Sequence, residues 1–189
     1  MAKITAEFKE TIASISRKEL EKLVLKAATK DKEFYNFIFI NFVDKEFGEN
    51  ELFEKAINDI DVLMNKGYKG YSEELQLANM LAACNKRIDE FGKVCKNKSL
   101  VIDLILKVLE VPFSLSSNMF TTCFTNYNYR VFILLKKAIS ILENKLHEDY
   151  QIQYEHTLNT YLEIFHRTSS HLDYVYGFQK KVKHSTFKN

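Results

Sequence analysis

The sequence predicts an all-α protein: a single domain of about seven or eight antiparallel helices, arranged as a bundle or a short solenoid of helical hairpins. The chain has 189 residues, of which 46% are hydrophobic and 28% charged, a composition typical of a globular protein with a sizeable core. It contains only one Pro and five Gly. This scarcity disfavours a β-sandwich or barrel, because those folds need many residues that suit tight turns. The domain is expected to span residues 1–189, with flexible ends at 1–10 and 180–189.

The first helix is predicted to begin at Ser16. Ser16 and Glu19 have the spacing of a capping box, in which each side chain satisfies a backbone amide of the first turn. The next segment, DKEFYNFIFINFV, suits either a strand or a helix. A helix after Asp31 is favoured, because no partner strand is evident elsewhere in the chain. The apolar residues that support the first helix are Leu20, Leu23, Val24 and Ala27.

Three more helices are predicted in the middle of the chain. One runs from Glu51 and is followed by Gly67, which is placed where a C-terminal cap belongs. Ser72 is expected to cap the next, which has acidic residues in its first turn. The third follows KNKS and is expected to end at Pro112, because proline interrupts the hydrogen-bond ladder of a helix. Apolar positions on these helices include Phe53, Ile60, Leu81, Ile88, Phe91, Leu104 and Val108.

The stretch VPFSLSSNMFTTCFTNYNYR, residues 111–130, fits neither the helix pattern before it nor the one after it. Its serines compete for backbone hydrogen bonds as turn residues do, so the sequence predicts a loop, a short helix, a turn and then a long helix. The short helix is expected to begin at Ser117 or Asn118. The residues expected to enter the core from this stretch are Met119, Phe120, Cys123 and Phe124.

A second interpretation makes the same stretch a binding surface. It is uncharged until Arg130 and mixes Asn and Tyr with Phe, which is the character of many interfaces. Tyr127, Tyr129 and Arg130 are the candidate contact residues, because loops on a rigid scaffold often carry binding residues. Two long helices are predicted after it, the first ending near HED and the last running from about Tyr150 to Gly177 with Leu172 and Tyr176 facing inward.

Charge and cysteine usage indicate the compartment and exclude several classes of partner. A net charge of +2 does not indicate a strongly basic surface for binding nucleic acid, although Lys180 and Lys181 begin a basic tail. A nucleic-acid partner is therefore disfavoured. Three cysteines, an odd number without metal-type clustering, make a disulfide framework unlikely and favour a cytoplasmic protein. The absence of an apolar run of about 18 residues predicts that the chain does not cross a membrane.

The E-x-x-H motif within LEIFH is the most specific candidate for a metal site in the sequence. Glu163 and His166 share one face of a helix, so both could bind a divalent transition metal, as in carboxylate-bridged helical bundles. Those sites use a second E-x-x-H, and this chain has none. His156 lies ten residues from His166, about 15 Å along a helix, which is too far for one ion. A solvated polar face explains these residues more simply.

Other chemistry has less support in the sequence. Cys123 could act as a nucleophile, but no histidine is placed beside it, and lone cysteines are usually small buried apolar residues. Phosphate-binding Gly loops, zinc-finger spacings and nucleophile elbows do not occur. The sequence therefore predicts a non-enzymatic cytoplasmic interaction or scaffold protein, which binds a protein partner or its own copy. The alternative is a metal-binding bundle or metal-dependent enzyme that uses Glu163 and His166.

Overall fold

A computed structural model describes residues 4–44, 47–123 and 125–182, and within these ranges the regular structure is entirely helical. The predicted all-α class is confirmed. The chain forms two compact units, residues 1–48 and residues 49–189. The extent of the folding domain stays a prediction, and so does the flexibility of the two ends. Residues 1–3 and 183–189 of those ends lie outside the described ranges.

Within residues 4–44, the N-terminal unit contains three α-helices and one π-helical turn. Each α-helix begins at a side-chain cap: Thr5 Oγ accepts from Phe8 N, Ser16 Oγ accepts from Glu19 N, and Asp31 accepts from the amides of the next turn. The caps predicted at Ser16 and the helix predicted after Asp31 are both present. A helix within residues 6–14 was not predicted. The elements are α1 (Ala6–Ser14), α2 (Arg17–Lys30), α3 (Lys32–Ile38) and a π-helical turn (Phe39–Val43).

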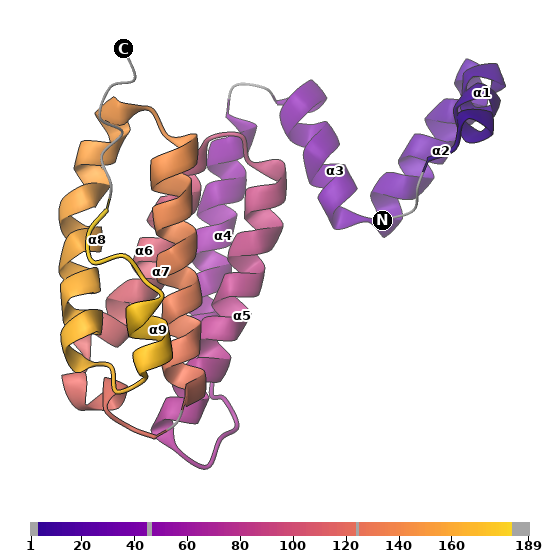
Figure 1. Cartoon of the computed structure of the whole chain (residues 1–189). Helices are drawn as coiled ribbons and strands as arrows, with labels where there is room; N and C mark the ends of the chain where they lie inside the picture. The colour runs from indigo at the N-terminus through magenta and orange to yellow at the C-terminus, as the bar shows by residue number, and fades with distance from the viewer. Residues whose placement is uncertain (1–3, 45–46, 124, 183–189) are drawn as a thin grey trace. The chain divides into compact units, whose positions relative to one another are not determined.

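The C-terminal unit is a bundle of long helices that stand side by side (Figure 1). Helix α7 lies at its centre and contacts α5, α6, α8 and α9. One continuous core fills the bundle, because the apolar stripes of all five long helices face inward. The elements are α4 (Gly48–Met64), α5 (Glu73–Val94), α6 (Lys98–Ser114), a 3-10 turn (Ser117–Phe120), α7 (Thr125–Lys145), α8 (Glu148–Thr168) and α9 (Leu172–Tyr176).

Two predicted helix ends are wrong. Helix α6 continues through Pro112 to Ser114, because a proline in the last turn costs only one backbone hydrogen bond, and its ring is buried in the core. Gly67 is not a left-handed cap, since no described glycine has a positive φ. Helix α4 ends earlier, at Met64, where the backbone amide and the side-chain amide of Asn65 both donate to Asp61 O.

The predicted last helix is also wrong, because α8 and α9 are separate. The break at residues 169–171 is fixed by hydrogen bonds to the stretch 111–130: Ser169 Oγ donates to Asn128 Oδ1 at 2.8 Å, and Ser170 N donates to Phe120 O at 3.2 Å. After this break, Leu172 and Tyr176 are exposed rather than directed inward. Contacts between distant segments therefore end a helix that the local sequence pattern would continue.

Candidate functional site

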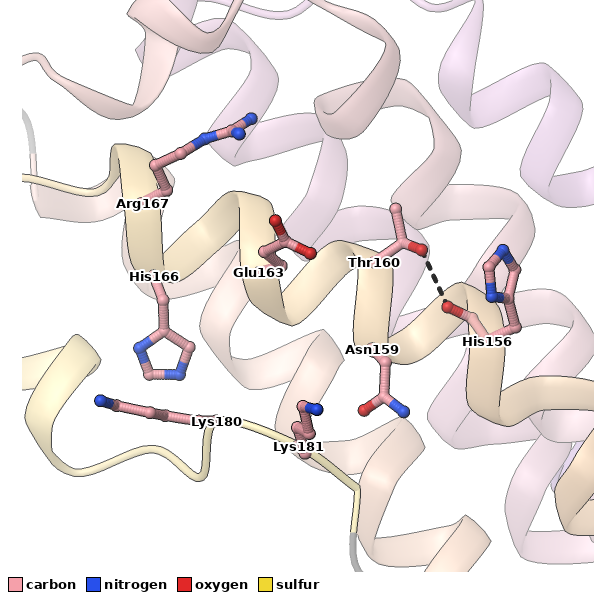
Figure 2. Close-up of a pocket in the computed structure, with 8 residues that line it drawn as sticks. All are labelled: His156, Asn159, Thr160, Glu163, His166, Arg167, Lys180 and Lys181. Carbon is pink, nitrogen blue, oxygen red and sulfur yellow. Dashed lines mark hydrogen bonds between the residues drawn. The ribbon is translucent and has the colours of Figure 1, made fainter.

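A pocket of about 590 Å³ lies beside α8 on the C-terminal unit. Helix α8 supplies one wall, and the segment that follows α9 supplies the other (Figure 2). Helix residues in the wall lie three or four positions apart and so share one side of α8. The lining residues are His156, Asn159, Thr160, Glu163, His166 and Arg167 from α8, and Lys180 and Lys181 from the segment.

The segment that carries the two lysines is anchored on both sides of them. Before them, the side chain of Phe178 is buried, and Gln179 O lies 3.1 Å from His166 Nε2. After them, Val182 is buried, and its backbone N–H donates to Asn159 Oδ1 at 2.9 Å. These contacts hold the backbone of residues 178–182 against α8. Lys180 and Lys181 are therefore presented over the pocket by a fixed backbone.

The described lining of this pocket is positively charged. Arg167, Lys180 and Lys181 are exposed, and none of the three forms an ion pair or hydrogen bond with another described residue. Glu163 contributes the one carboxylate among the described lining residues. In Figure 2, Arg167 extends away from the segment that carries Lys180 and Lys181, so the three cationic groups line the pocket without meeting at one point.

The structure places the predicted metal pair in this pocket but does not arrange it as a metal site. In Figure 2 the His166 ring points toward the segment with Lys180, while the Glu163 carboxylate points away from that segment. Within the described residues, no group of three His, Cys, Asp or Glu side chains lies close enough to hold one ion. The positive charge of Lys180 and Lys181 also opposes a metal cation. Metal binding by Glu163 and His166 stays a prediction that this geometry does not strengthen.

The other histidines near the end of the chain have structural contacts of their own. His147 caps α8 through Nδ1, which accepts from Asp149 N at 3.4 Å. His171 Nε2 lies 3.1 Å from Thr122 O, at the break between α8 and α9. His147 and His171 are therefore not among the residues that line the pocket, whereas His156 and His166 are.

The residues proposed as a binding surface in the stretch 111–130 have different environments. Tyr127 is only 1% exposed, and its ring packs against Phe120 in the core. Tyr129 is partly exposed beside Tyr174, and the Arg130 guanidinium lies 5.6 Å from the Tyr129 ring centre. An accessible surface here would thus consist of Tyr129 and Arg130, and its role in binding stays a prediction. The long helix α7 already includes all three residues.

The same stretch lines a second, smaller pocket of about 300 Å³. The Tyr127 hydroxyl is buried and has no hydrogen-bond partner among the described residues. Burial raises the pKa of Tyr127 strongly, and the nearby carboxylates of Glu73 and Glu74 raise it further, so the hydroxyl stays protonated. Cys123 lies at this pocket and is exposed, so the prediction that it enters the core is wrong; Phe124 lies outside the described residues.

A set of exposed apolar side chains on the N-terminal unit is the other candidate surface. No residue of α1, α2 or α3 is buried, and Ile40 is the one buried hydrophobic residue of the π-helical turn. We call the following the N-terminal apolar residues: Ile4, Phe8, Ile12, Leu23, Val24, Leu25, Tyr35, Phe37, Phe42, Val43 and Phe47.

Sequence reasoning missed both surfaces for identifiable reasons. Phe8 and Ile12 lie one helical turn apart, which is a signal for an amphipathic helix, but the expectation of a flexible end at residues 1–10 leaves this helix out. Arg167 joins Lys180 and Lys181 only because the chain turns back after α9. The spacing of residues along the sequence does not predict that turn.

Comparisons with models of protein families, with curated proteins and with solved structures each found no match to this chain. No helix of the described residues has the length and apolar character needed to cross a membrane. The charges, contacts and exposed surfaces of the two units are therefore the basis for a functional proposal.

Proposed function

We propose that this chain is a cytoplasmic, non-enzymatic interaction protein that associates with a second copy of itself through the N-terminal apolar residues. One observation carries the proposal: three amphipathic helices in which no side chain is buried. Helices of 7 to 14 residues are marginal in water unless their apolar faces pack against something. A partner surface supplies that packing.

The size of the exposed surface fits an interface. The five exposed aromatic residues of this unit are 47–69% exposed, which corresponds to roughly 500 Å² of side-chain surface at typical aromatic side-chain areas. The aliphatic members of the set add to this area. A stable interface buries about 800 Å² on each partner. The N-terminal apolar residues therefore offer an area of the size that one partner contributes.

The chemistry of the surface favours a second copy as the occupant. Interfaces between identical subunits are more apolar than transient interfaces between different proteins, and their cores contain few charges. The N-terminal apolar residues include five aromatic and six aliphatic side chains over 44 residues. An apolar surface can also match itself about a two-fold axis, since no charge complementarity is required. A different protein partner is the competing occupant.

The proposal is tested by light scattering of the full chain after size-exclusion chromatography. We expect a dimer for the native sequence and a monomer for the double variant Leu23→Ser, Phe42→Ser. Both side chains are exposed, so the fold of the monomer should tolerate their replacement. The matched control is Val62→Ser with Ile152→Ser, which removes two equally exposed apolar side chains from α4 and α8.

The control variant is expected to remain a dimer. Two results would contradict the proposal: a monomer for the native sequence at all concentrations, or equal loss of association in both double variants. A native monomer that forms a stoichiometric complex with one different protein would assign the surface to that partner instead of to a second copy. Circular dichroism of each variant establishes that it is folded.

A further inference from the structure

We infer that the smaller pocket, where α5 and α7 begin, binds a small organic ammonium ion. The inference concerns the C-terminal unit and is independent of self-association by the N-terminal unit. The residues that line this pocket of about 300 Å³ come from two segments, 71–75 and 123–127. Helices α5 and α7 both begin at the same end of the bundle, which brings the two segments together (Figure 1).

The first observation is a buried hydroxyl without a partner. Tyr127 is 1% exposed and lines the pocket, and its hydroxyl forms no hydrogen bond with a described residue. Burial raises the pKa of Tyr127 most, and the carboxylates of Glu73 and Glu74 raise it further, so the hydroxyl end of the ring lies near the first turn of α5. The phenol of α7 therefore extends toward the α5 side of the pocket. A buried hydroxyl without a partner is costly, and a ligand in the pocket would supply one.

The second observation is the charge of the lining. Glu74 is half-buried and is the one charged residue among the described residues that line this pocket. Its carboxylate forms no ion pair or hydrogen bond with another described residue. The dipole of α5 explains an acidic residue in its first turn, but it does not explain the unpartnered hydroxyl of Tyr127 beside it. A ligand that meets both groups should be a cation, because the carboxylate repels an anion.

An organic ammonium ion fits these groups better than a metal ion does. Within the described residues, no three His, Cys, Asp or Glu side chains lie close enough together to hold a metal. A protonated primary amine has three N–H donors, so it can donate to the Glu74 carboxylate and to the phenolic oxygen of Tyr127 at once. Tyr71 and Leu75 offer apolar contacts for the organic part of the ligand. The volume of about 300 Å³ is at the lower end of the range for pockets that bind small molecules.

The test uses 2-phenylethylamine as the probe and 2-phenylethanol as the matched neutral ligand of the same shape. Backbone amide shifts of the isotope-labelled chain are followed by NMR at neutral pH during titration with each compound. We expect the amine to shift the amides of residues 71–75 and 125–127. The alcohol should bind about tenfold more weakly, because it lacks the charge-assisted contact with Glu74. Raising the salt concentration should weaken binding of the amine, because salt screens its charge.

Variants then separate this pocket from general surface charge. Glu74→Gln should weaken binding of the amine about tenfold, the loss expected for one charge-assisted hydrogen bond. The control is Glu90→Gln, which removes the same charge from an exposed position of α5 and should leave the affinity within about twofold. Tyr127→Phe should weaken binding about fivefold, the loss expected for one neutral hydrogen-bond partner. Because the Tyr127 hydroxyl has no partner among the described residues, this variant should be as stable as the native chain to urea.

Four outcomes would overturn the inference. The first is an absence of shifts at the pocket with the amine, and the second is equal binding of the alcohol, which would remove any role for the charge. The third is equal weakening by Glu74→Gln and Glu90→Gln, which would assign the effect to net charge. The fourth is a loss of stability in Tyr127→Phe, which would show that the hydroxyl has a structural partner such as an ordered water. Binding of n-butylamine as tightly as 2-phenylethylamine would support the ammonium site and exclude recognition of the aromatic part.

Discussion

Asn128 shows how single polar residues fix the shape of the bundle. Its side chain is fully buried, and its amide donates to Phe120 O at 3.4 Å while its carbonyl accepts from Ser169 Oγ at 2.8 Å. One residue of α7 therefore joins the 3-10 turn to the end of α8. A buried amide without partners would be costly, so this position requires both contacts together.

We predict that Asn128→Ala lowers the free energy of unfolding by about 2 kcal/mol, since it removes two buried hydrogen bonds, one to Phe120 O and one from Ser169 Oγ, from the interior of the bundle. Chemical denaturation by urea measures the effect. The matched control is Asn126→Ala, two residues earlier in α7, where the side chain is exposed and the expected change is below about 0.5 kcal/mol. Equal losses for the two variants would argue against a structural role for Asn128.

Buried thiols and phenols should make the protein sensitive to alkaline pH. Burial raises the pKa of Cys84 to about 11 and that of Cys95 to about 12, and burial raises the pKa of Tyr154 to about 12 with help from Asp103. In the unfolded chain these groups lose their protons near pH 9 to 10. Above that pH the native state holds more protons than the unfolded state, so stability falls as pH rises.

We therefore expect the free energy of unfolding to be steady up to about pH 8.5 and to fall between about pH 9 and 11. Urea denaturation at a series of pH values measures this dependence. Cys84→Ala should reduce the slope, because it removes one of the groups whose pKa is raised by burial. A stability that stays constant to pH 11 would show that these groups titrate normally in the folded state.

At the scale of elements, the segment after α9 behaves as part of the bundle. Phe178 packs edge-on against both Phe132 of α7 and Phe165 of α8, with ring centres 5.0 and 6.4 Å apart. Gln179 Nε2 donates to Glu143 Oε1 at 2.7 Å. These contacts tie the segment to two helices at once, which is why Lys180 and Lys181 have a defined place.

We predict that Phe178→Ala costs about 3 kcal/mol of stability, the usual loss for a buried aromatic ring. Tyr176→Ala, two residues earlier, is the control, because Tyr176 is 81% exposed and its loss should cost less than about 0.5 kcal/mol. Thermal or urea denaturation compares the two variants. A small effect of Phe178→Ala would mean that the segment does not contribute to the bundle core.

The elements that sequence reasoning predicted are those whose signal is local. Side-chain caps at Ser16 and Ser72 and the apolar stripes of α4 to α7 depend on residues three or four positions apart, and the structure has these helices. The wrong prediction of one continuous last helix has a long-range cause, because the end of α8 depends on Asn128, which lies 41 residues away from Ser169.

The residues of the candidate pocket also fall into two groups, those that local spacing predicts and those that it does not. Glu163 and His166 were recognised from their spacing, because both lie on α8. The place of Lys180 and Lys181 beside that helix could not be predicted, since it depends on a chain reversal after α9. The sequence alone thus identified the helix that forms one wall of the pocket. The positions of the charged residues around the pocket could be known only from the fold.

At the scale of the whole molecule, the two units differ in how they are stabilised. The C-terminal unit has one continuous core that includes Ile105, Leu135 and Leu158, all fully buried. The N-terminal unit buries no side chain of α1, α2 or α3. Hydrophobic burial is the main favourable term in folding, so a unit with so little of it needs a surface to pack against. Self-association provides that surface in our account.

Sedimentation equilibrium of the native 189-residue chain, over a hundredfold range of concentration, would show whether it self-associates. We expect a mass that rises from that of one chain to that of two as concentration increases, with the double variant Leu23→Ser, Phe42→Ser remaining at one chain throughout. A native mass of one chain at every concentration would contradict self-association through the N-terminal apolar residues.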